Sequence, residues 1–395
     1  MLLGLLHKAF IAPFSSLERS ILYLCAFLGQ FGSFGALLYL AFDFTGSDLS
    51  IVIAFYVGKF LFANLILLPF FFMLLKRHIG PAFFFSCVCM QIFILCLLYI
   101  HPELLTATTW NQGLVAGLLI ALVSSPFWTI FHNLMLHFTT TDNRGHEVSI
   151  AELGLKVGVV TASMMSGLML TFLPGIFFPL ASLACITVGT ITLALVTLDF
   201  TGQEVDRSTP MMQPYRDIFR RKLLNTATLF QGAVTSLIEF FVPIWMKFFG
   251  FSAIITGGVL IAQIAVRTFI SPITGALFER KDGSELRLGS IFFILGWLPW
   301  LFISHIGLLL YSFINWAVSS HTINVGMDSR WYDEQTLEGM ATREIMLGIG
   351  RFLCAIIIMP LLVVSPHMFI ISCIALALVF IGISFFLKKR QDTNA

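Results

Sequence analysis

Charged residues interrupt several long apolar stretches of this sequence. At the centre of a bilayer one charge costs about 2.5–3.5 kcal/mol on insertion scales, so a charge in a membrane span is a functional candidate by default. Arg267 is the deepest, at least about 15 Å from either end of its expected helix at roughly 1.5 Å per residue. Buried cations attract anionic ligand groups, and a buried glutamate can exchange a proton. The full set of such residues is Lys59, Lys156, Glu239, Arg267 and Arg351.

Each deep charge also has a structural interpretation. Lys156 follows Glu152 by four residues, a spacing that favours an ion pair on one helix face, and its stem can also reach the inner surface. A fixed salt bridge is the alternative for Lys59 and for Arg351. Glu239 is either a proton site or the counter-ion of a buried cation. Sequence alone leaves these alternatives open.

The composition indicates a protein that is solvated by lipid. Hydrophobic residues make up 58% of the chain, charged residues 11%, and the mean hydropathy is +0.92. Soluble domains carry about 25% charged residues. The formal net charge of +2 comes without a basic stripe, so we expect no nucleic-acid partner.

No motif indicates an enzyme, a metal or another cofactor. A Walker loop, a His-Glu-x-x-His motif and a Gly-x-Ser-x-Gly motif are missing from the sequence, which argues against ATP drive and against a hydrolase. All seven cysteines lie in apolar runs. Cys87 and Cys89 are two residues apart, so on a helix they point to nearly opposite sides and cannot easily share a metal.

Apolar runs long enough to cross a bilayer, which takes about 20 residues, recur along the whole chain. We expect twelve membrane-spanning helices. Their ranges are Ser20–Phe42, Ile51–Leu75, Pro81–Ile100, Gly113–Phe138, Ile150–Leu173, Ile176–Leu198, Leu224–Phe248, Ser252–Phe278, Leu288–Ile303, Ile306–Gly326, Ala341–Val364 and His367–Leu387.

The cations between these spans and at their ends are distributed unequally between the two sides of the membrane. The inner set includes Lys76, Arg144, Arg330 and Arg343, whereas the outer loops hold only Lys247. The positive-inside rule then places both termini in the cytoplasm. Short loops and the lack of a soluble domain suit a multi-pass protein of the bacterial inner membrane, and we expect a monomer.

A polar stretch divides the chain into two related parts. Residues 1–198 and 223–395 are each expected to form a bundle of six helices, joined by a cytoplasmic linker over residues 199–222. Internal repeats of this kind build many secondary transporters. The repeat pairs Asn133, Glu147, Glu152 and Gly158 with Asn324, Glu338, Glu344 and Gly350 at spacings that agree to within one residue.

A short motif follows the second and eighth spans. The second copy reads Gly275-Ala-Leu277-Phe-Glu279-Arg280, with Gly283 one residue later than usual and Glu in place of Asp. The first copy keeps Leu74, Arg77 and Gly80 but lacks the acid. With six plus six helices and a long central loop, the sequence resembles the major facilitator superfamily. The resemblance implies two pseudo-symmetric six-helix bundles, alternating access, and a cytoplasmic latch that uses Glu279 and Arg280.

The resemblance also implies which helices surround the substrate. The first, fourth, seventh and tenth spans would line the cavity, and the second, fifth, eighth and eleventh would flank it. The former carry His132, Asn133, Glu239, Asn315 and His321, and the latter carry Lys59, Lys156, Arg267 and Arg351.

Four deep cations against one clear anion favour a small organic anion or zwitterion as the transported molecule. Proton coupling is a second hypothesis, with Glu239 first and Glu152 or Glu344 next. A proton-driven multidrug exporter that uses Glu239 for cations is an alternative function. A receptor or assembly protein that keeps a transporter scaffold without transporting is another. The lipid bilayer and a small-molecule substrate are the expected partners.

Overall fold

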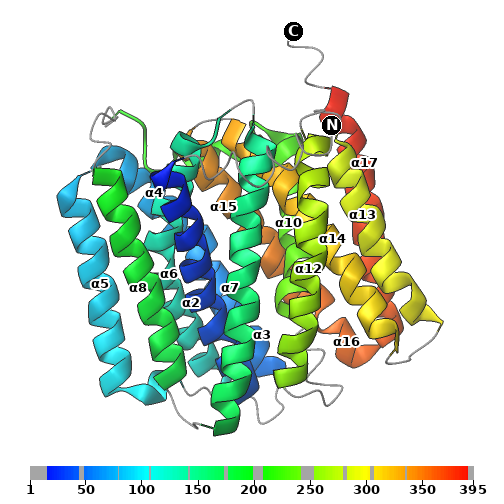
Figure 1. Cartoon of the computed structure of the whole chain (residues 1–395), viewed down its shortest axis with the longest axis horizontal. Coiled ribbons are helices and arrows are strands. Elements are labelled where there is room, and N and C mark those ends of the chain that lie inside the picture. Colours follow the sequence, from blue (N-terminus) through cyan, green and yellow to red (C-terminus); the bar gives the residue numbers. More distant parts are fainter. Residues whose placement is uncertain are drawn as a thin grey trace.

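A computed structural model describes the chain over residues 16–43, 49–78, 80–105, 108–140, 143–172, 177–198, 208–241, 253–278, 283–302, 307–333 and 336–389. All regular structure in these ranges is helical, and the fold is an all-α membrane fold. Helical segments overlap every one of the twelve predicted ranges, and the long ones run side by side (Figure 1).

The first half forms one group of helices. The second predicted span is built from three consecutive pieces, with a π-helical turn, η3, in the middle. The elements are α2 (Leu17–Asp43), α3 (Leu49–Phe62), η3 (Ala63–Leu67), α4 (Leu68–Arg77), α5 (Pro81–Ile100), η4 (Pro102–Leu105), α6 (Trp110–Phe138), α7 (Arg144–Phe172) and α8 (Phe177–Leu198).

The second half repeats this pattern after a short linker helix, α9 (Gln213–Asp217). Its eleventh predicted span also contains a π-helical turn, η7. The elements are α10 (Lys222–Thr235), η5 (Ser236–Phe241), α12 (Ala253–Phe278), α13 (Ser284–Trp297), η6 (Leu298–Leu301), α14 (Gly307–Asp333), α15 (Leu337–Leu353), η7 (Cys354–Ile358), α16 (Leu361–Val364) and α17 (Pro366–Lys389).

The outer face of the bundle is apolar and its interior holds charge. Phe85 and Phe93 on α5 and Phe386 on α17 are exposed, whereas Lys59 is only 8% exposed and Arg267 only 3%. Among the described residues, six helical segments are long and apolar enough to cross a membrane. Because lipid tolerates exposed apolar side chains but not lone charges, this distribution fits a bilayer as solvent.

Two apolar clusters form the core. One is built mainly from residues 22–194 and the other mainly from residues 227–380. In the first half α2 packs against α7 and α8, and in the second half α10 packs against α15 and α17. The halves meet where α7 contacts α12 and α14, and where α15 contacts α3, η3 and α4.

The paired glycines of the repeat occupy equivalent places in the two halves. A Cβ on Gly158 of α7 would lie 2.6 Å from the Phe27 carbonyl oxygen of α2. A Cβ on Gly350 of α15 would lie 1.9 Å from the Leu229 carbonyl oxygen of α10. Both glycines therefore let two helix backbones approach more closely than any side chain allows, which gives the matched spacing a packing reason.

Several helices extend further than the sequence predicts. α7 begins at Arg144 rather than Ile150, α14 ends at Asp333 rather than Gly326, and α15 begins at Leu337 rather than Ala341. Arg144 and Arg330, which lie beyond the predicted spans, therefore lie within helices. Carboxylates pair with them and with Arg343 near the start of α15, and this lowers the cost of their burial. The ion pairs are Arg144 with Asp333, Arg330 with Glu285, and Arg343 with Asp328 and Glu344.

The predicted gating motif is described only in part, because Glu279 and Arg280 lie outside the described residues. A Cβ on Gly275 of α12 would lie 2.4 Å from His146 Nδ1 of α7, so this glycine permits close contact between the halves. Gly283 has φ of 71°, a left-handed conformation that favours glycine, and it caps the start of α13.

Candidate functional site

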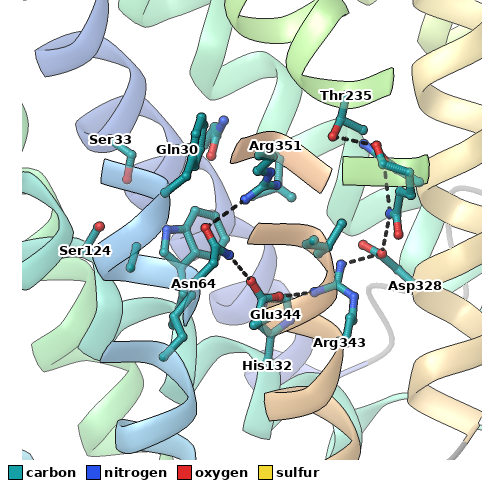
Figure 2. Close-up of a pocket in the computed structure, with 18 of the residues that line it drawn as sticks. Gln30, Ser33, Asn64, Ser124, His132, Thr235, Asp328, Arg343, Glu344 and Arg351 are labelled. Atoms are coloured by element: carbon teal, nitrogen blue, oxygen red, sulfur yellow. Dashed lines mark hydrogen bonds and ion pairs between the residues drawn. The ribbon is translucent and has the colours of Figure 1, made fainter. Parts of the chain in front are cut away.

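A cavity of about 130 Å³ lies between the two halves. Helices α2, α3, η3, α4, α6 and α7 of the first half line one side, and α10, α14 and α15 of the second half line the other. Figure 2 shows the polar side chains that converge on it. Sites between repeats are where secondary transporters bind substrate.

The described lining of this cavity carries more positive than negative charge. Four cations face three carboxylates, which leaves one positive charge in excess. Because the lining is buried between helices, its charges interact more strongly than they would in water. The cations are Lys59, Lys156, Arg343 and Arg351, and the carboxylates are Glu152, Asp328 and Glu344.

Glu344 is held by groups from both halves. Asn64 Nδ2 of η3 donates a hydrogen bond of 2.7 Å to Glu344 Oε2, and the Arg343 guanidinium pairs with Glu344 Oε1 (Figure 2). Arg343 also pairs with Asp328 of α14. Arg351 donates to Asn64 Oδ1 at 3.4 Å, so a single amide connects this guanidinium to Glu344.

A histidine from the first half approaches the same carboxylate. His132 Nε2 of α6 lies 3.7 Å from Glu344 Oε1. On the other side of the ring, His132 Nδ1 lies 2.6 Å from the Tyr332 hydroxyl of α14. The imidazole thus lies between a buried phenol and a buried carboxylate.

A second polar chain crosses the cavity lining. Gln231 Nε2 of α10 donates to Asp328 Oδ1 at 2.9 Å and lies 3.2 Å from Asn324 Oδ1. Asn324 Nδ2 in turn lies 3.4 Å from Glu152 Oε2 of α7. Lys156 Nζ lies 3.7 Å from Glu152, so the ion pair that the spacing predicts is present.

The structure brings only part of the predicted site together. His132, Lys59, Lys156 and Arg351 line the cavity. Asn133 and Asn315 are buried elsewhere, and Asn315 Nδ2 donates to the Tyr311 carbonyl oxygen at 2.7 Å. Asn133 follows His132 directly, and consecutive helix residues point about 100° apart. The side chain of Glu239 lies outside the described residues.

Arg267, the deepest cation in the sequence, does not line this cavity. Its guanidinium donates to Ser320 Oγ of α14 at 2.6 Å. Nearby, Ser149 Oγ of α7 lies 2.6 Å from Ser271 Oγ of α12 and 3.0 Å from His321 Nε2 of α14. Arg267 therefore contacts α14 within the region where α7, α12 and α14 pack together. Arg343 takes its place among the cations of the cavity lining.

Sequence reasoning missed Asn64 and Asp328 and counted Arg343 with the cations of the inner membrane side. Asp328 lies beyond the predicted end of the tenth span and Arg343 lies two residues inside the predicted start of the eleventh, where a hydropathy pattern gives little signal. Asn64 interrupts the apolar run FLFANLIL, and a polar side chain within such a run could have identified it as a candidate site residue.

The end of the bundle that holds the linker is crossed by ion pairs between the halves. We call it the linker end. Arg144 of α7 pairs with Asp333 of α14 at 2.6 Å, and Lys76 of α4 pairs with Glu338 of α15. The neighbouring Arg77 donates to the Thr209 carbonyl oxygen at 2.5 Å, so this motif residue holds the linker.

The linker helix α9 is hydrogen-bonded to both halves. The Tyr215 hydroxyl donates to the Leu65 carbonyl oxygen of η3 at 2.5 Å. Thr342 Oγ1 of α15 lies 3.1 Å from the Pro214 carbonyl oxygen. Leu65 and Thr342 directly adjoin the cavity-lining residues Asn64 and Arg343.

Two related groups of membrane helices with a charged cavity between them form an arrangement that many membrane transporters share. The sequence profile of the Major Facilitator Superfamily matches residues 20–331. The chain belongs to this superfamily and is a membrane transporter.

A solved structure supports the same fold. The crystal structure of the human organic anion transporter MFSD10 (TETRAN) aligns with a TM-score of 0.60 and 10% identity, covering 94% of this chain and 100% of that one. At this identity the likeness concerns the fold. No curated protein sequence matches the chain.

Proposed function

We propose that the protein moves a small organic anion or zwitterion by alternating access across a bacterial inner membrane, with the linker end in the cytoplasm. The observation that carries this proposal is the cavity between the halves, whose described lining holds one more cation than carboxylates. The excess of cations at the linker end supports the orientation.

The charge of the lining supports an anionic group on the substrate. An anion that enters a buried cavity with surplus positive charge gains more Coulomb energy than it would in water. Phe60 and Trp128 also line the cavity and offer contacts for an apolar substrate body. The name of MFSD10, an organic anion transporter of the same fold, accords with this class.

The contacts of the linker end support a gate there. In the proposed cycle, residues 1–198 and 223–395 move as two bodies and residues 199–222 tether them. Opening toward the linker end requires the pairs Arg144–Asp333 and Lys76–Glu338 to separate, because each joins the two bodies.

Counterflow in proteoliposomes tests the proposal. The labelled probes are p-aminohippurate as an aromatic carboxylate, phenylalanine as a zwitterion, and 1-methyl-4-phenylpyridinium as a cation. We expect the wild type to exchange the carboxylate or the zwitterion, and Arg351→Gln to lower that exchange about tenfold or more, since a lost charge-assisted hydrogen bond is worth about 1.5–3 kcal/mol.

The matched control is Arg220→Gln, which removes an exposed linker cation that does not line the cavity. Exchange by this variant should equal that of the wild type. Exchange of the cation alone, or an equal loss in both variants, contradicts the proposal.

A further inference from the structure

We propose that Glu344 is the carboxylate that couples transport to protons, and that His132 and Tyr332 carry its proton. This inference rests on the proposed function, because it assigns the coupling site of the same cavity.

The first argument is the position of Glu344 between the two halves. Its Oε2 accepts from Asn64 of the first half at 2.7 Å, and its Oε1 contacts Arg343 of the second half. Asn64 also accepts from Arg351 at 3.4 Å. A change in the charge of Glu344 therefore alters a contact between the moving bodies and the surroundings of two cations that face the cavity.

The other two described carboxylates of the lining are placed differently. Asp328 accepts from Gln231 and pairs with Arg343, and both of these partners belong to the second half. Glu152 also contacts the second half, because Asn324 Nδ2 of α14 lies 3.4 Å from its Oε2, and its ion-pair partner is Lys156, one helical turn away in its own helix. Of the three, Glu344 is the one that has an imidazole nitrogen at 3.7 Å. A proton donor and a link between the halves therefore coincide at Glu344.

The second argument concerns charge. With Glu344 ionised, Arg343 divides its guanidinium between two carboxylates. A proton on Glu344 neutralises one of these, frees part of Arg343 for a substrate anion, and raises the positive excess of the lining by one. Proton and anion then favour each other's binding, and this coupling is reciprocal. The predicted outcome is symport of proton and anion.

The third argument is a route for the proton. In the tautomer with hydrogen on Nε2, His132 gives that proton to Glu344 Oε1 while Nδ1 takes the proton of the Tyr332 hydroxyl. The gap of 3.7 Å must first close to hydrogen-bond length. The route requires water to restore the proton of the buried Tyr332 phenol, and the side chain of the next residue, Asp333, is 33% exposed at the linker end. One proton enters from water and one arrives at Glu344, so the transfer balances.

Other groups around Glu344 bear on its protonation. Asn64 of η3 and Gln231 of α10 are neutral, and Lys76 of α4 and Tyr215 of α9 contact other partners. The neighbouring cations stabilise the ionised form of Glu344. When Glu344 takes up a proton, a substrate anion must therefore supply the negative charge that Arg343 loses. The titratable and charged groups are Lys59 from α3, His132 from α6, Asp328 and Tyr332 from α14, and Arg343 and Arg351 from α15.

The test uses the full-length protein in phosphatidylcholine vesicles with labelled p-aminohippurate. We expect the wild type to accumulate the probe when the outside is acidic, and its exchange to change about tenfold between about pH 5.5 and 7.5, within the usual range of coupling. Glu344→Gln mimics the protonated acid, so its exchange should vary less than about twofold and accumulation should disappear. His132→Gln should slow accumulation more than exchange.

Two controls make the result specific. Glu103→Gln alters an exposed loop carboxylate and should behave as the wild type. Glu152→Gln removes another acid of the lining and should keep the pH dependence of exchange. Accumulation by Glu344→Gln, or equal loss of pH dependence in Glu152→Gln, overturns the proposal. Wild-type exchange without any response to a pH gradient also overturns it, while leaving anion transport in place.

A measurement without substrate covers the case in which p-aminohippurate is not exchanged, which would count against the proposed substrate class. Infrared difference spectra of the protein in the same vesicles, taken during acidification, should show a protonated carboxyl band. The band should lose one component in Glu344→Gln, and Glu152→Gln should keep that component. A band that is unchanged in Glu344→Gln places the proton elsewhere.

Discussion

Arg144 of α7 and Asp333 of α14 lie 2.6 Å apart and join the two halves of the transporter at the linker end. Arg144 is fully buried, and it also donates to Thr139. Arg144→Gln removes a charge-assisted hydrogen bond worth about 1.5 kcal/mol or more, so the equilibrium should shift roughly tenfold toward opening at this end.

Labelling of an introduced cysteine measures this shift. Leu347 lines the cavity and is buried, so Leu347→Cys in a background without the native cysteines reports opening. In inside-out vesicles an impermeant maleimide should react faster in Arg144→Gln. The double exchange Arg144→Asp with Asp333→Arg should restore slow labelling, and failure to do so would show that the pair itself is not the gate.

Gly350 should tolerate replacement by any larger residue poorly. A Cβ there would lie 1.9 Å from the Leu229 carbonyl oxygen, so Gly350→Ala must push α15 away from α10. We expect a loss of about 1–3 kcal/mol, as for other overpacked sites. Gly382→Ala is the control, because a Cβ there has no neighbour within 4 Å and alanine favours the helix. Thermal unfolding in detergent should separate the two variants clearly.

Tyr215 should anchor the linker to the first half. Tyr215→Phe removes the hydrogen bond to the Leu65 carbonyl oxygen and should lower stability by about 0.5–1.5 kcal/mol. Burial raises the pKa of Tyr215, so the phenol remains a neutral donor at ordinary pH. Limited proteolysis within residues 199–207 should quicken in this variant. An unchanged cleavage rate would mean that the bond does not hold the linker.

Arg267 should act through stability rather than substrate choice. Its guanidinium contacts Ser320 in the packed region between α12 and α14. Arg267→Gln should therefore lower the unfolding temperature but keep the preference for carboxylate over cation probes, whereas Arg351→Gln should weaken carboxylate exchange. A loss of anion preference in Arg267→Gln would return this residue to the substrate site.

The sequence predicts the fold well because the thickness and apolar interior of the bilayer directly determine the length and hydropathy of each membrane-spanning helix. It predicts the cavity less well, because two kinds of information are missing from a hydropathy pattern. The first is which side of each helix faces the cavity: Arg267 and Lys59 are both deep in their predicted spans, yet of these two only Lys59 lines the cavity. The second is helix length beyond the predicted spans: Asp328 lies past the predicted end of the tenth span, yet it is buried in α14 and pairs with Arg343.

The attachment of α9 has a practical consequence. This helix contacts Leu65 and Thr342, the immediate neighbours of two residues that line the cavity, and the adjoining Met212 is 57% exposed. A fluorophore on a cysteine at position 212 would thus be exposed to water, while α9 contacts the immediate neighbours of two cavity-lining residues. We expect the fluorescence of such a label to change when a ligand occupies the cavity, which would allow binding to be followed without a radioactive compound.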